Sequence, residues 1–167
     1  TVVPKPKEYV SGESFTYLGR NYRLKLVSGG LREVKLRGGY LELGVSKGTK
    51  ERDIRNALLD WYEEHALNRL TEKTARYANI MGVTSNSIVA RDYKSRWGSC
   101  SSKGDISYNW RIIIAPHQIV DYMVVHELCH MQHPNHSPAY WDSVKRVIPD
   151  YKESRQWLKD HGASLIV

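Results

Sequence analysis

The chain has 167 residues, of which 41% are hydrophobic and 26% are charged, and these proportions are ordinary for a soluble globular protein. No run of 18 apolar residues is present, which excludes a membrane-spanning helix. Two cysteines without a visible signal peptide predict free thiols, a reducing compartment and a cytoplasmic location. A chain of this length is long enough to bury a hydrophobic core.

The net charge of +7 is concentrated towards the N-terminus. Residues 1–48 contain nine Lys or Arg against four Asp or Glu, an excess of +5, whereas residues 49–167 contain sixteen against fourteen, an excess of +2. We therefore predict a basic, β-rich subdomain over 1–48 and a second domain over 49–167. The basic surface either attracts nucleic acid or another polyanion or is an ordinary solvated surface, and no recognised nucleic-acid-binding module favours the first interpretation.

The N-terminal part begins with an extended segment and continues as a small sheet. Pro4 and Pro6 predict an extended linker over residues 1–7. Between residues 9 and 45, three runs of alternating apolar and polar residues are separated by glycines, which predicts a β-meander. The apolar positions of these runs are Phe15, Tyr17, Tyr22, Leu24, Leu26, Leu41, Leu43 and Val45.

A long helix is predicted from Thr49, a suitable N-cap, to Gly82. Its apolar stripe is typical of a helix that packs against a core. The clearest positions of the stripe are Ile54, Leu58, Trp61 and His65, and Leu67, Leu70 and Thr74 continue it less regularly.

A second β region begins at residues 87–90. Residues 96–100 and 106–114 predict two strands joined by a loop at 102–105, which together form a short antiparallel sheet. The polar side chains of this region either contact substrate and support the site from beneath, or form a purely structural hydrogen-bond network. They are Arg96, Asn109 and Arg111.

The stretch His126-Glu127-Leu128-Cys129-His130 is an H-E-x-x-H motif in an apolar helical pattern that starts near Pro116. Positions four apart lie on one helix face, so His126 and His130 can direct imidazole nitrogens at one ion. Zinc favours such ligands, and the carboxylate of Glu127 is placed to take a proton from water that the metal acidifies. We therefore predict one zinc ion per chain, with Glu127 as the general base. The buried face of this helix is expected to consist of Ile119, Val120, Met123, Val124 and Leu128.

Two histidines alone hold zinc weakly, so a third ligand is needed. Pro134 disfavours helix at the residue before it, and we expect the helix to end near His133 and the chain to turn back towards the metal. His136 is then the expected third ligand in preference to His133. Cys129 lies about 100° from the ligand face, which predicts a small buried residue and not a ligand.

Two further helices are predicted after the motif. Ser137-Pro138 is a good N-cap and N1 pair for the first of them. Asp150-x-x-Glu153 resembles a capping box for the second, which we expect to stop at Gly162. Tyr122 lies one turn before the motif and is expected to pack in the core.

Several short segments together carry a family resemblance. They are residues 96–100 and 106–111, Ala115-Pro116, Asp121-Tyr122, the H-E-x-x-H motif and Asn135-His136-Ser137.

In these segments the chain closely resembles the YgjP-like metallopeptidase family, formerly described as a domain of unknown function and related to the SprT-like and WLM zinc proteases. The resemblance extends over essentially the whole chain and is strongest over 96–158. It implies a zinc-dependent, peptidase-like fold in which His126, His130 and His136 are ligands and Glu127 is the base. Members usually carry a further N-terminal segment, and because the chain begins at Thr1 without Met, we expect such a segment to precede it.

The resemblance also implies how substrate is held. In related zinc peptidases a strand above the ligand helix offers its edge to an extended peptide, whose backbone hydrogen bonds tolerate many sequences. One strand between residues 87 and 114 is expected to do this. A peptidase also needs a group that stabilises the oxyanion. The sequence does not choose among the candidates Tyr140, Tyr151, Arg96 and Arg111.

The predicted fold is α+β, with a small N-terminal β-meander, a long helix, a short antiparallel sheet and a zincin-like metal-site helix followed by C-terminal helices. The first functional hypothesis is a zinc metallopeptidase that acts on a peptide or protein. The second is a metal-dependent hydrolase of a nucleotide or other phosphate substrate, although no Gly-rich phosphate loop is present. The third is a non-enzymatic module with a structural zinc, against which the adjacent Glu127 and the three expected ligands argue.

Overall fold

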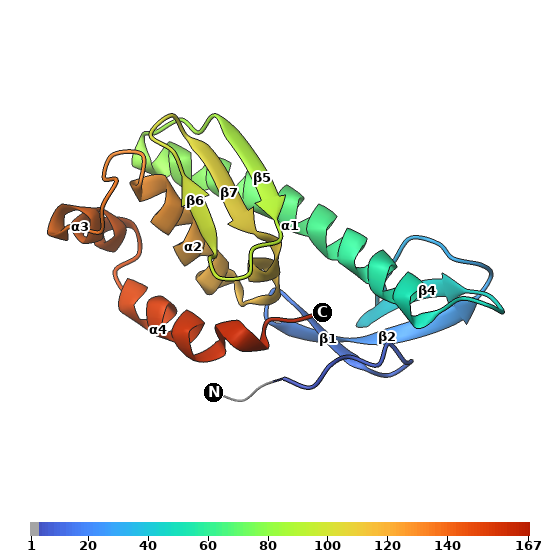
Figure 1. The fold of residues 1–167 in the computed structure, drawn as a ribbon. Helices are drawn as coiled ribbons and strands as arrows, with labels where there is room; N and C mark the ends of the chain where they lie inside the picture. The colour runs from blue at the N-terminus through green and yellow to red at the C-terminus, as the bar shows by residue number, and fades with distance from the viewer. Residues whose placement is uncertain (1–3) are drawn as a thin grey trace.

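One long helix, α1 (Glu51–Met81), runs past two small sheets and connects them (Figure 1). The computed structural model describes residues 4–167. The first sheet packs at the N-terminal half of α1, and the second sheet covers its C-terminal half together with α2 (His117–Cys129). Two shorter helices complete the C-terminal part. This mixed architecture confirms the predicted α+β fold.

The N-terminal sheet contains four strands in the order β1-β2-β4-β3. The three predicted runs form β1, β2 and β4, which are neighbours in the predicted order, and β4 buries Leu41 and Leu43 completely. The meander prediction is wrong in strand direction, because β4 lies parallel to β2, and it missed the exposed strand β3. Of the predicted linker, residues 1–3 lie outside the described part, and residues 4–7 have no regular secondary structure. The strands are β1 (Ser14–Tyr17), β2 (Arg20–Ser28), β3 (Lys35–Arg37) and β4 (Tyr40–Val45).

Helix α1 is continuous over 31 residues and ends, as predicted, at Gly82, whose φ of 69° is readily adopted by glycine. Its N-cap is Lys50 and not Thr49, because the Thr49 hydroxyl accepts a hydrogen bond from the N–H of Ser46. The predicted stripe is buried at Ile54, Leu58, Trp61, Leu70 and Thr74, with Tyr62, Ala66 and Ala78 in addition, whereas Leu67 is 38% exposed.

The second sheet is mixed, with the order β5-β7-β6. Strands β6 and β7 are antiparallel as predicted, but β5 lies parallel to β7. Residues 110–114, expected to continue a strand, form a short 3-10 helix, η1 (Trp110–Ile114). The Asn109 side chain begins η1 by accepting a hydrogen bond from the Arg111 N–H at 3.1 Å. The strands are β5 (Ser87–Arg91), β6 (Gly98–Cys100) and β7 (Asp105–Asn109).

Helix α2 starts after Pro116 and buries its whole predicted apolar face. It ends at Cys129 with His130 as the C-cap, one turn earlier than the predicted end near His133. The turn continues to His133 through a hydrogen bond from its N–H to the carbonyl of Cys129 at 3.0 Å. The second histidine of the motif therefore sits at the helix end, where the chain can change direction.

The two C-terminal helices are α3 (Pro138–Val147) and α4 (Tyr151–His161). Ser137 caps α3 as predicted, since its hydroxyl accepts a hydrogen bond from the Tyr140 N–H at 3.3 Å. The predicted capping box of α4 is wrong: Asp150 is the N-cap, but its side chain makes no capping hydrogen bond. Gly162 has a right-handed φ of −54° and leads into η2 (Gly162–Ser164).

The N-terminal sheet is bonded to η1, the segment that leads into α2. The N–H groups of Leu18 and Gly19 donate to the carbonyls of Ile113 and Ile114 at 2.8 and 3.0 Å. The Tyr62 hydroxyl on α1 donates to the carbonyl of Thr16 at 2.7 Å. These bonds and the surrounding hydrophobic cluster fix where α2 begins.

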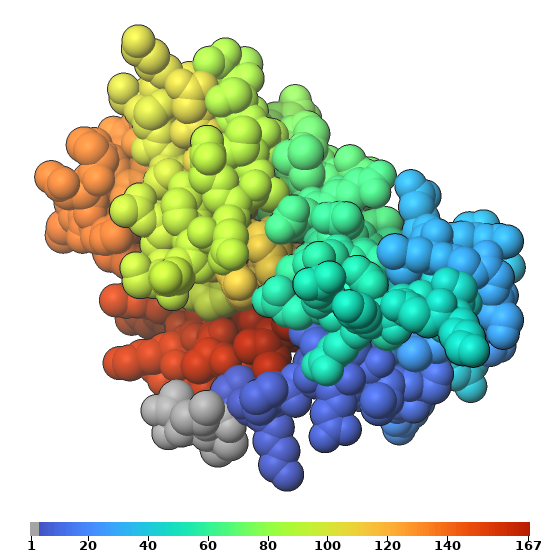
Figure 2. All heavy atoms as spheres, turned by 45° about the vertical axis from the view of Figure 1, so that its right-hand side comes forward, coloured from blue at the N-terminus to red at the C-terminus, as the bar shows by residue number. Residues whose placement is uncertain are grey.

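Helix α4 lies between the second sheet and the N-terminal segment, where it forms one edge of the molecule (Figure 2). The Tyr9 hydroxyl bonds the carbonyl of Val167 at 3.3 Å, which joins the two ends of the described chain. Within residues 4–167, no helix combines the length and the apolar character that crossing a membrane requires.

Candidate metal centre

Three histidines meet where α2 ends and the chain turns towards α3. One nitrogen from each of His126, His130 and His136 lies within 4.8 Å of those of the other two. The Nε2 atoms of His130 and His136 are 3.0 Å apart. Ending α2 at Cys129 allows this, because the following turn brings His136 back over the helix end. The structure thus brings together all three residues that the sequence analysis selected.

The chemistry of this set fits a metal ion. His130 Nδ1 lies 3.0 Å from the carbonyl of His133, an oxygen that only accepts, so this nitrogen carries the proton and Nε2 keeps its lone pair. The buried Nδ1 of His126 has no hydrogen-bond partner among residues 4–167. Burial, together with the neighbouring His126 and His130, lowers the pKa of His136 and favours its neutral, coordinating form. Three neutral imidazoles are a donor set that zinc accepts.

Aromatic side chains pack against the three histidines. The ring of Tyr140 is fully buried and stacks on His130, with ring centroids 4.7 Å apart. Its hydroxyl donates to the backbone carbonyl of His126 at 2.8 Å. The Trp141 ring packs against His136 with ring centroids 5.6 Å apart, and it stacks on Tyr151 with centroids 5.1 Å apart. Tyr140 and Tyr151 therefore belong to the aromatic packing around the histidines. The Tyr140 hydroxyl is already engaged in its hydrogen bond to the His126 carbonyl.

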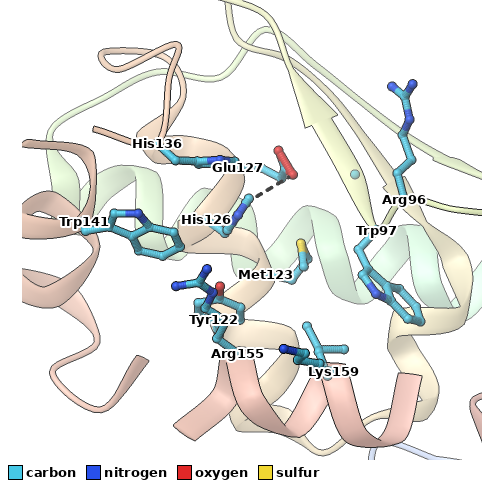
Figure 3. Close-up of a pocket in the computed structure, with 12 residues that line it drawn as sticks. Arg96, Trp97, Tyr122, Met123, His126, Glu127, His136, Trp141, Arg155 and Lys159 are labelled. Atoms are coloured by element: carbon cyan, nitrogen blue, oxygen red, sulfur yellow. Dashed lines mark ion pairs between the residues drawn. The ribbon is translucent and has the colours of Figure 1, made fainter. Parts of the chain in front are cut away.

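Glu127 is only 2% exposed, and its carboxylate lies beside the histidines at the wall of a pocket (Figure 3). Its Oε2 atom is 3.6 Å from His126 Nδ1. Gly98 of β6 leaves room for the carboxylate, since a Cβ at position 98 would lie 2.9 Å from Oε2. The Glu127 side chain, which projects from α2, is therefore packed against β6 at Gly98.

The pocket has a volume of about 420 Å³. Helix α2, the strand β6 with the loop before it, and helices α3 and α4 all contribute to its walls (Figure 3). Other lining residues were not predicted from the sequence as site residues, because they become neighbours only through tertiary packing. They include Trp97, Gly98, Trp141, Arg155, Leu158 and Lys159.

The three polar residues of the second sheet have different surroundings. Asn109 is buried, and its amide nitrogen donates to the carbonyls of Tyr93 and Arg96 at 3.0 and 3.1 Å. Arg111 pairs with Asp92 and lies over the Trp110 ring, outside the residues that line the pocket. Arg96 is exposed and lines the pocket. Asn109 and Arg111 thus lie in a structural network, whereas Arg96 lines the pocket with its guanidinium over the Tyr93 ring.

The residues that were expected not to act as ligands lie outside the histidine cluster. His133 Nε2 contacts the Ser143 hydroxyl at 3.1 Å, and Cys129 is a buried free thiol whose pKa burial raises to about 11. Tyr122 packs edge-on against His126 with ring centroids 5.8 Å apart, and also lines the pocket. Its predicted packing role agrees with this arrangement.

Of the comparisons with known proteins, the match to a family model supports the resemblance seen in the sequence. No curated protein matches the chain. Among solved structures, the metallopeptidase zymogen of Pyrococcus abyssi abylysin is 23% identical, with a TM-score of 0.49. That match covers 54% of this chain and 93% of abylysin. The family model described as YgjP-like, metallopeptidase domain matches residues 2–161. The chain, a peptidase-like hydrolase, therefore belongs to the YgjP-like metallopeptidase family.

Proposed function

We propose that the chain is a zinc-dependent peptidase in which His126, His130 and His136 hold the ion and Glu127 is the general base. The observation that carries this proposal is the convergence of three imidazoles at a pocket whose wall contains a buried carboxylate. Zinc, when bound, supplies a Lewis acid that polarises a peptide carbonyl and acidifies water. Glu127 accepts the proton of the attacking water and returns it to the leaving amine.

The same proposal assigns substrate binding to β6. This strand lies at one edge of its sheet, packs against α2 and contributes Gly98 to the pocket. An extended peptide that pairs with β6 passes directly in front of Glu127. Backbone pairing of this kind selects an unfolded segment over a folded surface. The proposed substrate is therefore a peptide or an extended segment of a protein.

The first experiment compares the zinc-loaded parent with Glu127→Gln on a mixture of denatured proteins, and detects new peptide termini. We expect Glu127→Gln to keep one zinc per chain and to lose cleavage by about 10²–10⁴-fold, the usual contribution of a general base. Glu153→Gln is the matched control, because Glu153 is an exposed glutamate on α4 outside the pocket. Equal cleavage by parent and Glu127→Gln would refute the proposed role of this residue.

A second experiment tests the ligand set by zinc titration without any substrate. His136→Ala is expected to weaken zinc binding strongly, since it removes one of three donors. His133→Ala is the matched control, because it removes the ring that contacts Ser143 and keeps the backbone carbonyl beside His130. Equal zinc affinities for the two variants would contradict the proposed site. Release of phosphate from nucleotides by the parent alone would assign the pocket to phosphate chemistry.

A further inference from the structure

The pocket wall is strongly basic. Among its lining residues are the cations Arg96, Arg155 and Lys159, and Glu127 is the single acidic residue among them. Arg155 and Lys159 both rise from α4, which runs along the lower side of the pocket in Figure 3. The approach to the histidines is therefore a cationic surface.

The two cations on α4 are held on the pocket side of the helix. They are four positions apart, so they share one face and repel each other. The buried Leu158 next to Lys159 anchors this part of α4 in the core. The Arg155 guanidinium lies over the Trp141 ring at 4.7 Å from its centroid, which fixes its position beside His136.

Neither cation is neutralised by the protein itself. Within residues 4–167, Arg155 and Lys159 make no ion pair with a carboxylate, and both are exposed. An anionic ligand bound between these two adjacent, unpaired cations would reduce the repulsion between them.

We propose that Arg155 and Lys159 form a subsite that binds an acidic side chain, Asp or Glu, of the peptide substrate close to the scissile bond. This inference rests on the proposed peptidase function, since the subsite faces the same pocket as Glu127. A guanidinium binds a carboxylate through two parallel hydrogen bonds, and the neighbouring ammonium adds charge without a fixed geometry. The peptidase would then prefer acidic segments over basic ones.

The test measures binding and cleavage separately. Fluorescent peptides that are identical except for Glu, Gln or Lys at one position are titrated into zinc-loaded Glu127→Gln, which holds peptide without turnover. One exposed charge pair changes affinity by up to about fivefold, so two cations predict about tenfold tighter binding of the Glu peptide than of the Gln peptide. The preference should weaken with added salt.

Variants of the subsite are made in the same background. Arg155→Gln with Lys159→Gln is expected to abolish the preference, and Arg155→Glu with Lys159→Glu to reverse it towards the Lys peptide. The matched control is Lys145→Gln with Arg146→Gln, which removes the same charge from exposed residues of α3 outside the pocket. Zinc content and circular dichroism show that each variant is folded, and a variant that fails this check leaves the salt dependence of the unaltered subsite as the deciding measurement.

Each outcome separates the subsite from the catalytic proposal. Equal binding of the Glu and Gln peptides overturns the subsite, while cleavage of neutral peptides by the active parent still supports the peptidase. A Glu preference that depends on Arg155 and Lys159, without cleavage of any peptide, supports the subsite and overturns the proposed function. Binding of inorganic phosphate that depends on the pair, with no Glu preference, overturns the peptide subsite in favour of a phosphate site.

Discussion

Replacing Gly98 by alanine tests how the carboxylate of Glu127, the proposed general base, is positioned. A Cβ at this position would lie 2.8 Å from the carbonyl oxygen of Ser107 and 2.9 Å from Oε2 of Glu127. Gly98 has no positive φ, so the perturbation is steric and not a backbone strain. The contact with the Ser107 carbonyl forces β6 to shift within the sheet, and the contact with Oε2 displaces the carboxylate. Overpacking of this kind costs about 1–3 kcal/mol of the free energy of unfolding, and a displacement of about 1 Å lowers the rate by about 10²-fold.

The assay combines urea unfolding, zinc stoichiometry and peptide cleavage. Gly98→Ala is expected to unfold at lower urea and to cleave slowly while keeping its zinc. Ser99→Ala, the next residue of β6, is the matched control and should stay near the parent. Shortening the acid in Glu127→Asp should make Gly98→Ala less harmful, which a double-mutant cycle measures as coupling. Parent-like stability and cleavage in Gly98→Ala would refute the steric reasoning.

Three further predictions concern stability. Thr74→Val breaks the buried 2.8 Å hydrogen bond to the Tyr108 hydroxyl, and urea unfolding should show a loss of about 1–3 kcal/mol. Asn109→Ala removes a buried amide that donates to the carbonyls of Tyr93 and Arg96 in the loop before β6, and it should cost a similar amount and speed proteolysis of that loop. Hydrogen bonds, first from Ser87, lower the pKa of Asp105 in the folded state, so its contribution is present at neutral pH and lost as the pH falls. Asp105→Asn should therefore be less stable than the parent at pH 7 and equal to it in acid, as measured by thermal unfolding across pH.

The histidine cluster was predictable because its determinants are local in the sequence. The spacing of His126 and His130 is a property of one helix, and Pro134 predicts that the chain turns before His136. The position of the turn was less accurate: α2 ends at Cys129, four residues before the expected end. Where a helix ends depends on which hydrogen-bond donors its last carbonyls accept from. In α2, the turn that positions His136 begins directly after Cys129.

The direction of β4 and the presence of β3 could not be obtained from the same kind of pattern. Alternation predicts strands and the faces they bury, but it does not say whether neighbouring strands run parallel or antiparallel. Placing β4 beside β2 buries two leucines in the middle of the sheet, and this gain is visible only once the strands pack on α1. Residues 110–114 misled for a related reason, because a run of buried apolar residues fits a strand or a short helix equally well. The division at residue 48 stays a prediction.

The net charge of a stretch of sequence does not predict the charge of the pocket that its residues line. Residues 49–167 are nearly neutral in sum, which had placed the basic excess in the N-terminal part. Packing, however, distributes those charges unequally over the surface, and the pocket receives three cations for one acid. No described residue before Arg96 lines this pocket, so the basic N-terminal sheet contributes no charged side chain to its wall. The charge around the pocket is therefore set by α4 and by Arg96, and not by the net charge of either half of the chain.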